Sequence, residues 1–119
     1  MCAFSASATV PLSNLEINCR TKKHTIQIDN FHDSYRYKSW NLPKLLSDKP
    51  DMEVNKGTFD YEGTGFCRSR IWKFTKGSVQ FVIDDGTNCV ETEPPVGTVA
   101  YVSVLINGVQ RSLYFCKKY

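Results

Sequence analysis

Two histidines, His24 and His32, are the side chains in this sequence that ordinarily exchange protons near neutral pH. In a small secreted hydrolase of the ribonuclease type, two histidines, or one histidine and a glutamate, would act as acid and base, while a lysine or arginine held the phosphate. Their spacing matches no metal pair of the form H-x-x-x-H, and no G-x-S-x-G nucleophile motif accompanies them. We therefore favour two surface histidines at strand ends and predict that the protein is not an enzyme.

A cluster of carboxylates follows at Asp84-Asp85-Gly86-Thr87-Asn88, with Glu91 and Glu93 close behind. This segment resembles part of a calcium loop but lacks the terminal glutamate at the EF-hand spacing. Zinc is disfavoured as well, because no cysteine pair has the C-x2-4-C spacing. We predict no metal and no cofactor here, and interpret Asp84, Asp85, Glu91 and Glu93 as charges that dock a basic protein partner such as lysozyme.

Basic and aromatic side chains alternate shortly before that cluster. Such a pattern is typical of single-stranded nucleic-acid binding, and the residues are Phe66, Arg68, Arg70, Trp72, Lys73, Phe74 and Lys76. In an extended strand, however, alternate side chains partly point to opposite faces, so core packing explains most of the aromatics. The whole chain has 15 Lys and Arg against 12 Asp and Glu, a net charge of +3 that is small for a phosphate binder. We predict no nucleic-acid partner and retain Arg68 and Arg70 as docking charges.

Two glycines interrupt the regular pattern in Tyr61-Glu62-Gly63-Thr64-Gly65-Phe66-Cys67. Glycine inside a strand pattern indicates a bend, a bulge or close backbone approach to another group. We predict a protruding loop formed by Gly63, Thr64, Gly65 and Phe66 that contacts a protein partner. The alternative is a barrel-corner bend with no partner.

The elements that must position these residues are strands. Apolar and polar residues alternate along most of the 119-residue chain, and no stretch has the helical stripe at i, i+3, i+4 and i+7. We predict an all-β domain of about eight short antiparallel strands, arranged as a meander barrel or a two-sheet sandwich. Three turns are expected, at Asn55-Lys56-Gly57, Lys76-Gly77 and Asn107-Gly108. Pro43 and Pro50 bracket a loop or single helical turn. The face of Tyr35, Tyr37 and Trp40 is either core or interface.

Residues 1–8 end in Ala6-Ser7-Ala8, a small-x-small pattern that signal peptidase accepts. We interpret them as a signal-peptide remnant and residues 9–119 as a single β domain. An ordinary Ala- and Ser-rich start, or lipid attachment at Cys2, is the alternative. No apolar run reaches the length of a transmembrane helix.

Without the remnant, four cysteines remain, and four cysteines allow three pairings. The expected strands favour Cys67 with Cys89 and Cys19 with Cys116. Such bridges persist in an oxidising compartment, so we expect a periplasmic or secreted protein.

Several of these features occur together: an early strand cysteine (Cys19), the loop Gly63-Thr64-Gly65-Phe66, and Trp72 followed by Lys76-Gly77. In this respect the stretch from Met52 to Ile83 resembles the small periplasmic inhibitors of c-type lysozyme, which are disulfide-bearing antiparallel barrels of Gram-negative bacteria. The resemblance implies that the loop enters the lysozyme cleft, with Thr64 as its hydroxyl-bearing residue.

The sequence departs from that family in three ways. A Ser-Gly-x-x-Tyr segment is absent, Trp72 stands two residues farther from the Lys-Gly turn, and the Asp84–Val96 loop with its second disulfide is additional. The chain is also similar in size and cysteine use to periplasmic immunity proteins against type VI secretion effectors. We therefore expect a binding protein that inhibits a peptidoglycan-degrading enzyme, with a secreted hydrolase or a surface-adhesion module as the alternatives.

Overall fold

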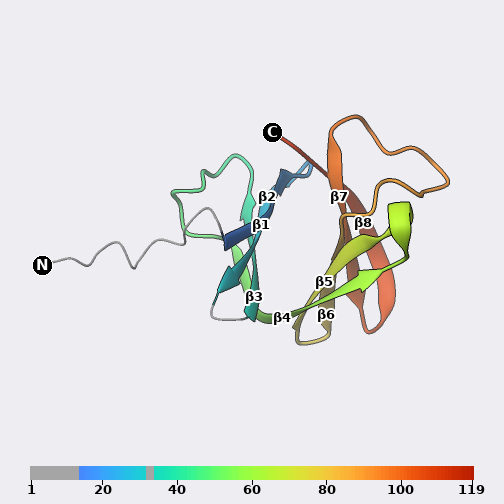
Figure 1. Cartoon of the computed structure of the whole chain (residues 1–119). Helices are drawn as coiled ribbons and strands as arrows, with labels where there is room; N and C mark the ends of the chain where they lie inside the picture. The colour runs from blue at the N-terminus through green and yellow to red at the C-terminus, as the bar shows by residue number, and fades with distance from the viewer. Residues whose placement is uncertain (1–13, 32–33) are drawn as a thin grey trace, which may run out of the picture.

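The computed structural model describes residues 14–31 and 34–119. Eight antiparallel strands form a closed barrel in which each strand pairs with the next in the chain. The predicted all-β antiparallel fold is thus confirmed, and of the two expected arrangements, barrel and sandwich, it is the barrel (Figure 1). The strands are β1 (Leu15–Arg20), β2 (His24–Phe31), β3 (Ser34–Asn41), β4 (Met52–Glu62), β5 (Ser69–Lys76), β6 (Val79–Asp84), β7 (Thr98–Ile106) and β8 (Val109–Lys117), with a short 3₁₀ turn, η3 (Gly65–Cys67), before β5.

The core is made by the inward-facing residues of the alternating pattern. Trp72 and Phe74 on β5 and Ile83 on β6 are completely buried, and they pack with buried residues of β1, β2, β3, β4, β7 and β8. Burying one such side chain stabilises the fold by roughly 1.5–3 kcal/mol relative to leaving it exposed. The strand period therefore decides which residues form the core, as expected.

Two of the three aromatic residues of β3 belong to the interior, and the third, Tyr35, is partly buried and packs against the core. Tyr37 is buried in the core, where its ring stacks on Phe81 with centroids 4.9 Å apart. Trp40 is also buried, and its indole Nε1 donates a hydrogen bond to the backbone oxygen of Asp48 at 2.8 Å. The segment between Pro43 and Pro50 is accordingly a loop that covers Trp40.

Two of the three expected turns are present. At Asn107-Gly108 both residues have positive φ, 52° and 79°, as the type I′ turn requires. Gly77 has φ 62° and joins β5 to β6, whose residues Lys76 and Val79 are paired.

The third expected turn is wrong, because Asn55-Lys56-Gly57 lies inside the continuous 11-residue strand β4. The first half of β4 pairs with β3 and the second half with β5. Lys56 has φ 60°, and the β3 register shifts by one residue between Tyr35↔Gly57 and Tyr37↔Val54. The local signal for a hairpin therefore produces a β-bulge, which bends β4 from one side of the barrel to the other (Figure 1).

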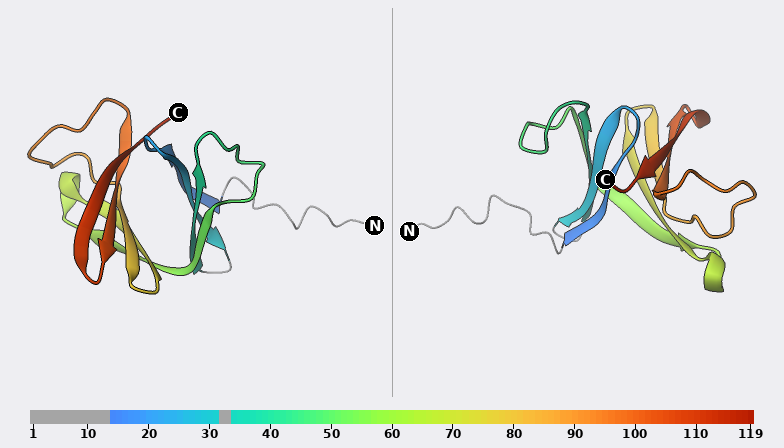
Figure 2. Two further views of the ribbon diagram at one scale, coloured as in Figure 1. Left: turned by 180° about the vertical axis from the view of Figure 1, so that it is seen from behind. Right: turned by 90° about the horizontal axis from the view of Figure 1, so that it is seen from above.

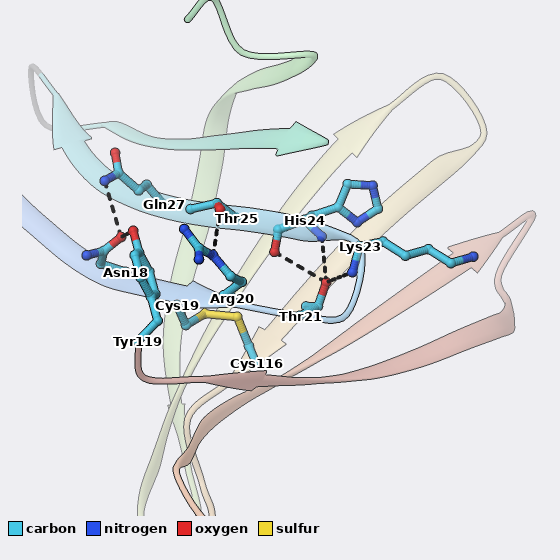
Figure 3. The surroundings of a disulfide bond; sticks show 10 residues. All are labelled: Asn18, Cys19, Arg20, Thr21, Lys23, His24, Thr25, Gln27, Cys116 and Tyr119. Atoms are coloured by element: carbon cyan, nitrogen blue, oxygen red, sulfur yellow. Dashed lines mark hydrogen bonds between the residues drawn. A yellow bond between two sulfur atoms is a disulfide. The ribbon is translucent and has the colours of Figure 1, made fainter. Parts of the chain in front are cut away.

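The barrel closes between β1 and β8, where one register pair, Arg20↔Lys117, joins the two strands in the described part of the chain. Beside it the Cys19–Cys116 disulfide connects residues 97 positions apart, and both cysteines are completely buried (Figure 3). Cys67 is bonded to Cys89. Both predicted pairings are confirmed, and two disulfides are consistent with an oxidising compartment.

The expected signal-peptide remnant, residues 1–8, lies outside the described residues. Within them, no helix is long and apolar enough to span a bilayer.

Candidate protein-binding loop

The residues predicted to contact a partner form the tip of the β4–β5 hairpin. After the last pair, Glu62↔Ser69, the chain turns through Gly63 and Thr64 into η3. Gly63 has φ 77°, and a Cβ there would lie 2.6 Å from the backbone oxygen of Cys67, so glycine is required on two grounds. Gly65 also has positive φ, 57°, but faces open space.

Three contacts hold this tip in shape. Backbone amides of Cys67 and Arg68 donate hydrogen bonds to the oxygens of Thr64 and Gly65, each at 3.1 Å. The Cys67–Cys89 disulfide ties the tip to the segment 85–97, which follows β6. Figure 2 shows η3 beside that segment in both views.

Asn88 strengthens the same connection, because its Nδ2 donates a hydrogen bond to the backbone oxygen of Phe66 at 3.3 Å. Sequence reasoning did not assign Asn88 to the site. Its position next to Cys89 was the available signal, since a disulfide brings the neighbours of both cysteines together.

The side chains that the tip presents are aromatic and cationic. Phe66 is 77% exposed, and Thr64 and Gly65 are exposed with it. Tyr61 is 48% exposed, and the Arg68 guanidinium lies over its ring at 3.8 Å. A cation stacked on an aromatic ring in this way has fewer conformations to lose on binding. Tyr61, which the sequence analysis did not count as a contact residue, thus belongs to the same surface.

Arg70 and Asp85, both predicted docking charges, are paired with each other. The Arg70 Nε lies 2.6 Å from Asp85 Oδ2, and the Arg70 backbone amide donates to Asp85 Oδ1 at 2.7 Å. In return, the Asp85 amide donates to the Arg70 oxygen at 3.1 Å, and Glu16 lies 3.6 Å from the same guanidinium. These contacts attach the start of the segment 85–97 to β5.

The surroundings of the nearby Tyr35 hydroxyl shift its pKa. Burial, followed by the negative charge of Glu16, raises the pKa of Tyr35 above its ordinary value, and Arg70 opposes that effect. The phenol is therefore neutral at physiological pH and contributes no charge to the site.

Asp84 is used locally, because its Oδ1 accepts a hydrogen bond from the Gly86 amide at 2.7 Å. Among the described residues no group of three or more His, Cys, Asp or Glu is arranged to hold a metal ion. Glu91 and Glu93 are exposed on the segment 85–97. Of the predicted docking charges, Arg68, Glu91 and Glu93 are therefore the exposed residues, whereas Asp84, Arg70 and Asp85 are only partly exposed.

His24 and the buried aromatics of β5 take no part in this loop. His24 begins β2, and its backbone amide donates to the Thr21 hydroxyl at 3.0 Å, while its ring makes no hydrogen bond to the other residues drawn in Figure 3. His32 lies outside the described residues. Trp72 and Phe74 are completely buried, so they offer no stacking surface to a nucleic-acid base.

No family model matches the sequence, and no curated protein or solved structure shows significant similarity to the chain. The function is accordingly inferred from the chain's own residues.

Proposed function

We propose that this domain is an exported binding protein that inhibits a peptidoglycan-degrading enzyme by inserting the loop Gly63–Phe66 into its substrate cleft. One observation carries the proposal: Phe66 is 77% exposed at the tip of a hairpin that a disulfide holds in place. An exposed aromatic on a rigid support is the type of residue that anchors protein interfaces. The resemblance to lysozyme inhibitors, which rests on the same loop, supports this interpretation.

The mechanism is occlusion, and this chain contributes no chemistry. The loop is already ordered by the Cys67–Cys89 bond, two backbone hydrogen bonds and Asn88. Binding then costs little further conformational entropy, which allows a small surface to bind tightly. Phe66 would occupy the cleft, and Thr64 would offer a hydroxyl at the same depth.

Arg68 gives the loop a charge that fits this class of target. Glycoside hydrolases cleave their substrates with a pair of carboxyl groups, so their clefts are acidic. Arg68, whose guanidinium lies over the Tyr61 ring at 3.8 Å, is separated from the loop by Cys67 alone. Its guanidinium would approach those carboxylates as Phe66 enters, while Glu91 and Glu93 would meet basic residues outside the cleft.

The proposed partners are lysozyme or secreted effectors that degrade peptidoglycan, in the periplasm or outside the cell. The test is a titration of the oxidised protein into a peptidoglycan-lysis assay with c-type lysozyme and with other peptidoglycan hydrolases. We expect lysis by the target to fall to zero at stoichiometric inhibitor. A folded protein that inhibits none of these enzymes would contradict the proposal.

A double variant, His24→Ala with His32→Ala, distinguishes the hydrolase alternative from the inhibitor proposal. An inhibitor that acts through Gly63–Phe66 should retain its full titration curve, whereas a histidine-dependent hydrolase would lose its activity. Loss of inhibition in the folded double variant would argue against the loop mechanism.

A further inference from the structure

A second surface lies where the barrel closes. β8 pairs with β7 along its length, but toward β1 it has a single partner, Arg20↔Lys117, in the described part of the chain. Among residues 14–31 and 34–119, no strand other than β7 therefore pairs with β8 from Val109 to Cys116. Unpaired N–H and C=O groups on such an edge are a template for another extended chain.

A groove of about 680 Å³ runs beside this edge. Leu113, Tyr114, Phe115, Pro95 and Tyr119 supply its apolar walls. Leu113 is 49% and Phe115 41% exposed, and the Phe115 ring makes an edge-on contact, with centroids 5.7 Å apart, with Tyr101, its register partner on β7. Apolar side chains of a bound strand would thus find a preformed surface next to the open edge.

The charges around the groove have one sign. Its described lining includes Arg20, Lys22, Lys117 and Lys118 but no acidic residue. The three lysines have no ion pair among the described residues. Arg20 ends β1 and Lys22 lies in the turn to β2, while Lys117 ends β8 and Lys118 follows it. Because Arg20 pairs with Lys117, the four cations gather at one end of the groove.

Arg20 is already positioned for a ligand. Its Nε donates to the Thr25 hydroxyl at 3.1 Å, and its guanidinium lies over the Tyr119 ring at 4.1 Å. The Tyr119 hydroxyl in turn donates to Asn18 Oδ1 at 3.0 Å, as Figure 3 shows. This chain of contacts holds a wall of the groove and one of its cations together.

We propose that the β8 edge binds an extended peptide by strand addition. The peptide has apolar side chains that contact Leu113 and Phe115, and a cluster of Asp or Glu at the end that meets Lys117. The open edge provides main-chain hydrogen bonds, the groove selects apolar side chains, and the four cations select acidic ones. This surface is separate from the loop Gly63–Phe66, so the inference does not depend on the proposed inhibition.

The experiment uses synthetic peptides of about eight residues, a usual strand length, in which valine and threonine alternate after an acidic cluster. One peptide carries the cluster at its N-terminus, for antiparallel addition, and the other at its C-terminus, for parallel addition. Each is titrated into the isotope-labelled, oxidised protein and followed by amide chemical shifts. We expect saturable binding of one peptide, with the shifts concentrated in β8 and at Arg20.

Matched variants test each part of the surface. Lys117→Glu with Lys118→Glu should weaken binding at least about tenfold, whereas Lys73→Glu with Lys76→Glu on β5 should not. Phe115→Glu should likewise abolish binding, whereas Val109→Glu, an exposed position of the same strand outside the groove, should leave it intact.

Four results would overturn the proposal. The first is equally tight binding of a peptide with lysines in place of its acidic residues, and the second is no binding of either acidic peptide. The third is equally tight binding of a peptide N-methylated at alternate residues, which would assign the groove to an amphiphile rather than a strand. Concentration-dependent dimerisation with the same shifts in β8 would instead assign the edge to a second copy of this chain.

Discussion

Gly57 lies directly against the ring of Phe74, so that a Cβ on Gly57 would stand 2.2 Å from the Phe74 Cε1. This contact occurs at the bulge of β4, next to Lys56 with its positive φ. The bulge thus does two things: it bends β4 between its two partners and admits a completely buried phenylalanine at the bend. The projection of the β4–β5 hairpin, and with it the loop, depends on this packing.

Gly57→Ala should therefore destabilise the domain by overpacking, at a cost of about 1–3 kcal/mol or more. Chemical denaturation of the oxidised protein measures the change. Combining it with Phe74→Leu should cost less than the sum of the two single changes, because the smaller side chain relieves the clash. An unchanged unfolding midpoint for Gly57→Ala would show that the close approach is not needed.

The two disulfides should contribute unequally. In the chain-entropy model the 97-residue separation of Cys19–Cys116 is worth about 4.7 kcal/mol and the 22-residue separation of Cys67–Cys89 about 3.4 kcal/mol. We expect Cys19→Ala with Cys116→Ala to lower the unfolding free energy more, because that pair also closes the barrel. Cys67→Ala with Cys89→Ala should leave the barrel folded but weaken inhibition. Equal stability losses, or full inhibition without Cys67–Cys89, would contradict this division of roles.

The Arg70–Asp85 pair should have a modest and specific effect. Because the Arg70 side chain is 38% exposed, solvent screens the ion pair, and a double-mutant cycle with Arg70→Met and Asp85→Asn should give a coupling of at most about 1 kcal/mol. Asp85→Ala should cost more than Asp85→Asn, since only asparagine keeps an acceptor for the Arg70 amide. Denaturant unfolding of the variants tests both statements, and equal costs for Ala and Asn would contradict the second.

Tyr37 should make stability depend on alkaline pH. Burial raises its pKa from 10.0 to about 12, so the folded state favours the neutral phenol. The pKa is higher when folded than when unfolded. The contribution of the neutral Tyr37 phenol to the free energy of unfolding is therefore complete below pH 10 and is lost as the pH rises through about 12.

Unfolding free energies of the wild type and Tyr37→Phe across this pH window provide the check. The difference in unfolding free energy between the wild type and Tyr37→Phe should change steadily above pH 10. A difference independent of pH would show that Tyr37 titrates normally in the folded state.

Alternation of side chains was enough to predict the strands, the all-β antiparallel class and both cysteine pairings, because burial follows the strand period, but it left a barrel and a sandwich as alternatives. It failed at Asn55-Lys56-Gly57, where the local pattern is the same for a hairpin and for a bulge. The bulge is accompanied by a contact of Gly57 with Phe74, a residue of another strand, and no local pattern contains that information.

The candidate site shows the same limit. The glycines and Phe66 marked the loop, since their types conflict with a regular strand. No sequence pattern indicated, however, that Arg70 and Asp85, 15 residues apart, form an ion pair with each other. Similarly, Arg20 and Lys117 come together only because β1 meets β8. Contacts between distant strands set which charges remain available.

The most direct test of the inhibitory loop compares two glycines in the peptidoglycan-lysis titration. Gly65 and Gly77 have nearly the same positive φ, 57° and 62°, and both face open space, but Gly77 lies at the opposite end of β5. Gly65→Val and Gly77→Val thus impose the same backbone strain, and Thr64→Arg adds bulk to the loop without that strain.

We expect Gly65→Val and Thr64→Arg to lose inhibition while folded, and Gly77→Val to inhibit like the wild type. Undiminished inhibition by both loop variants would contradict the account.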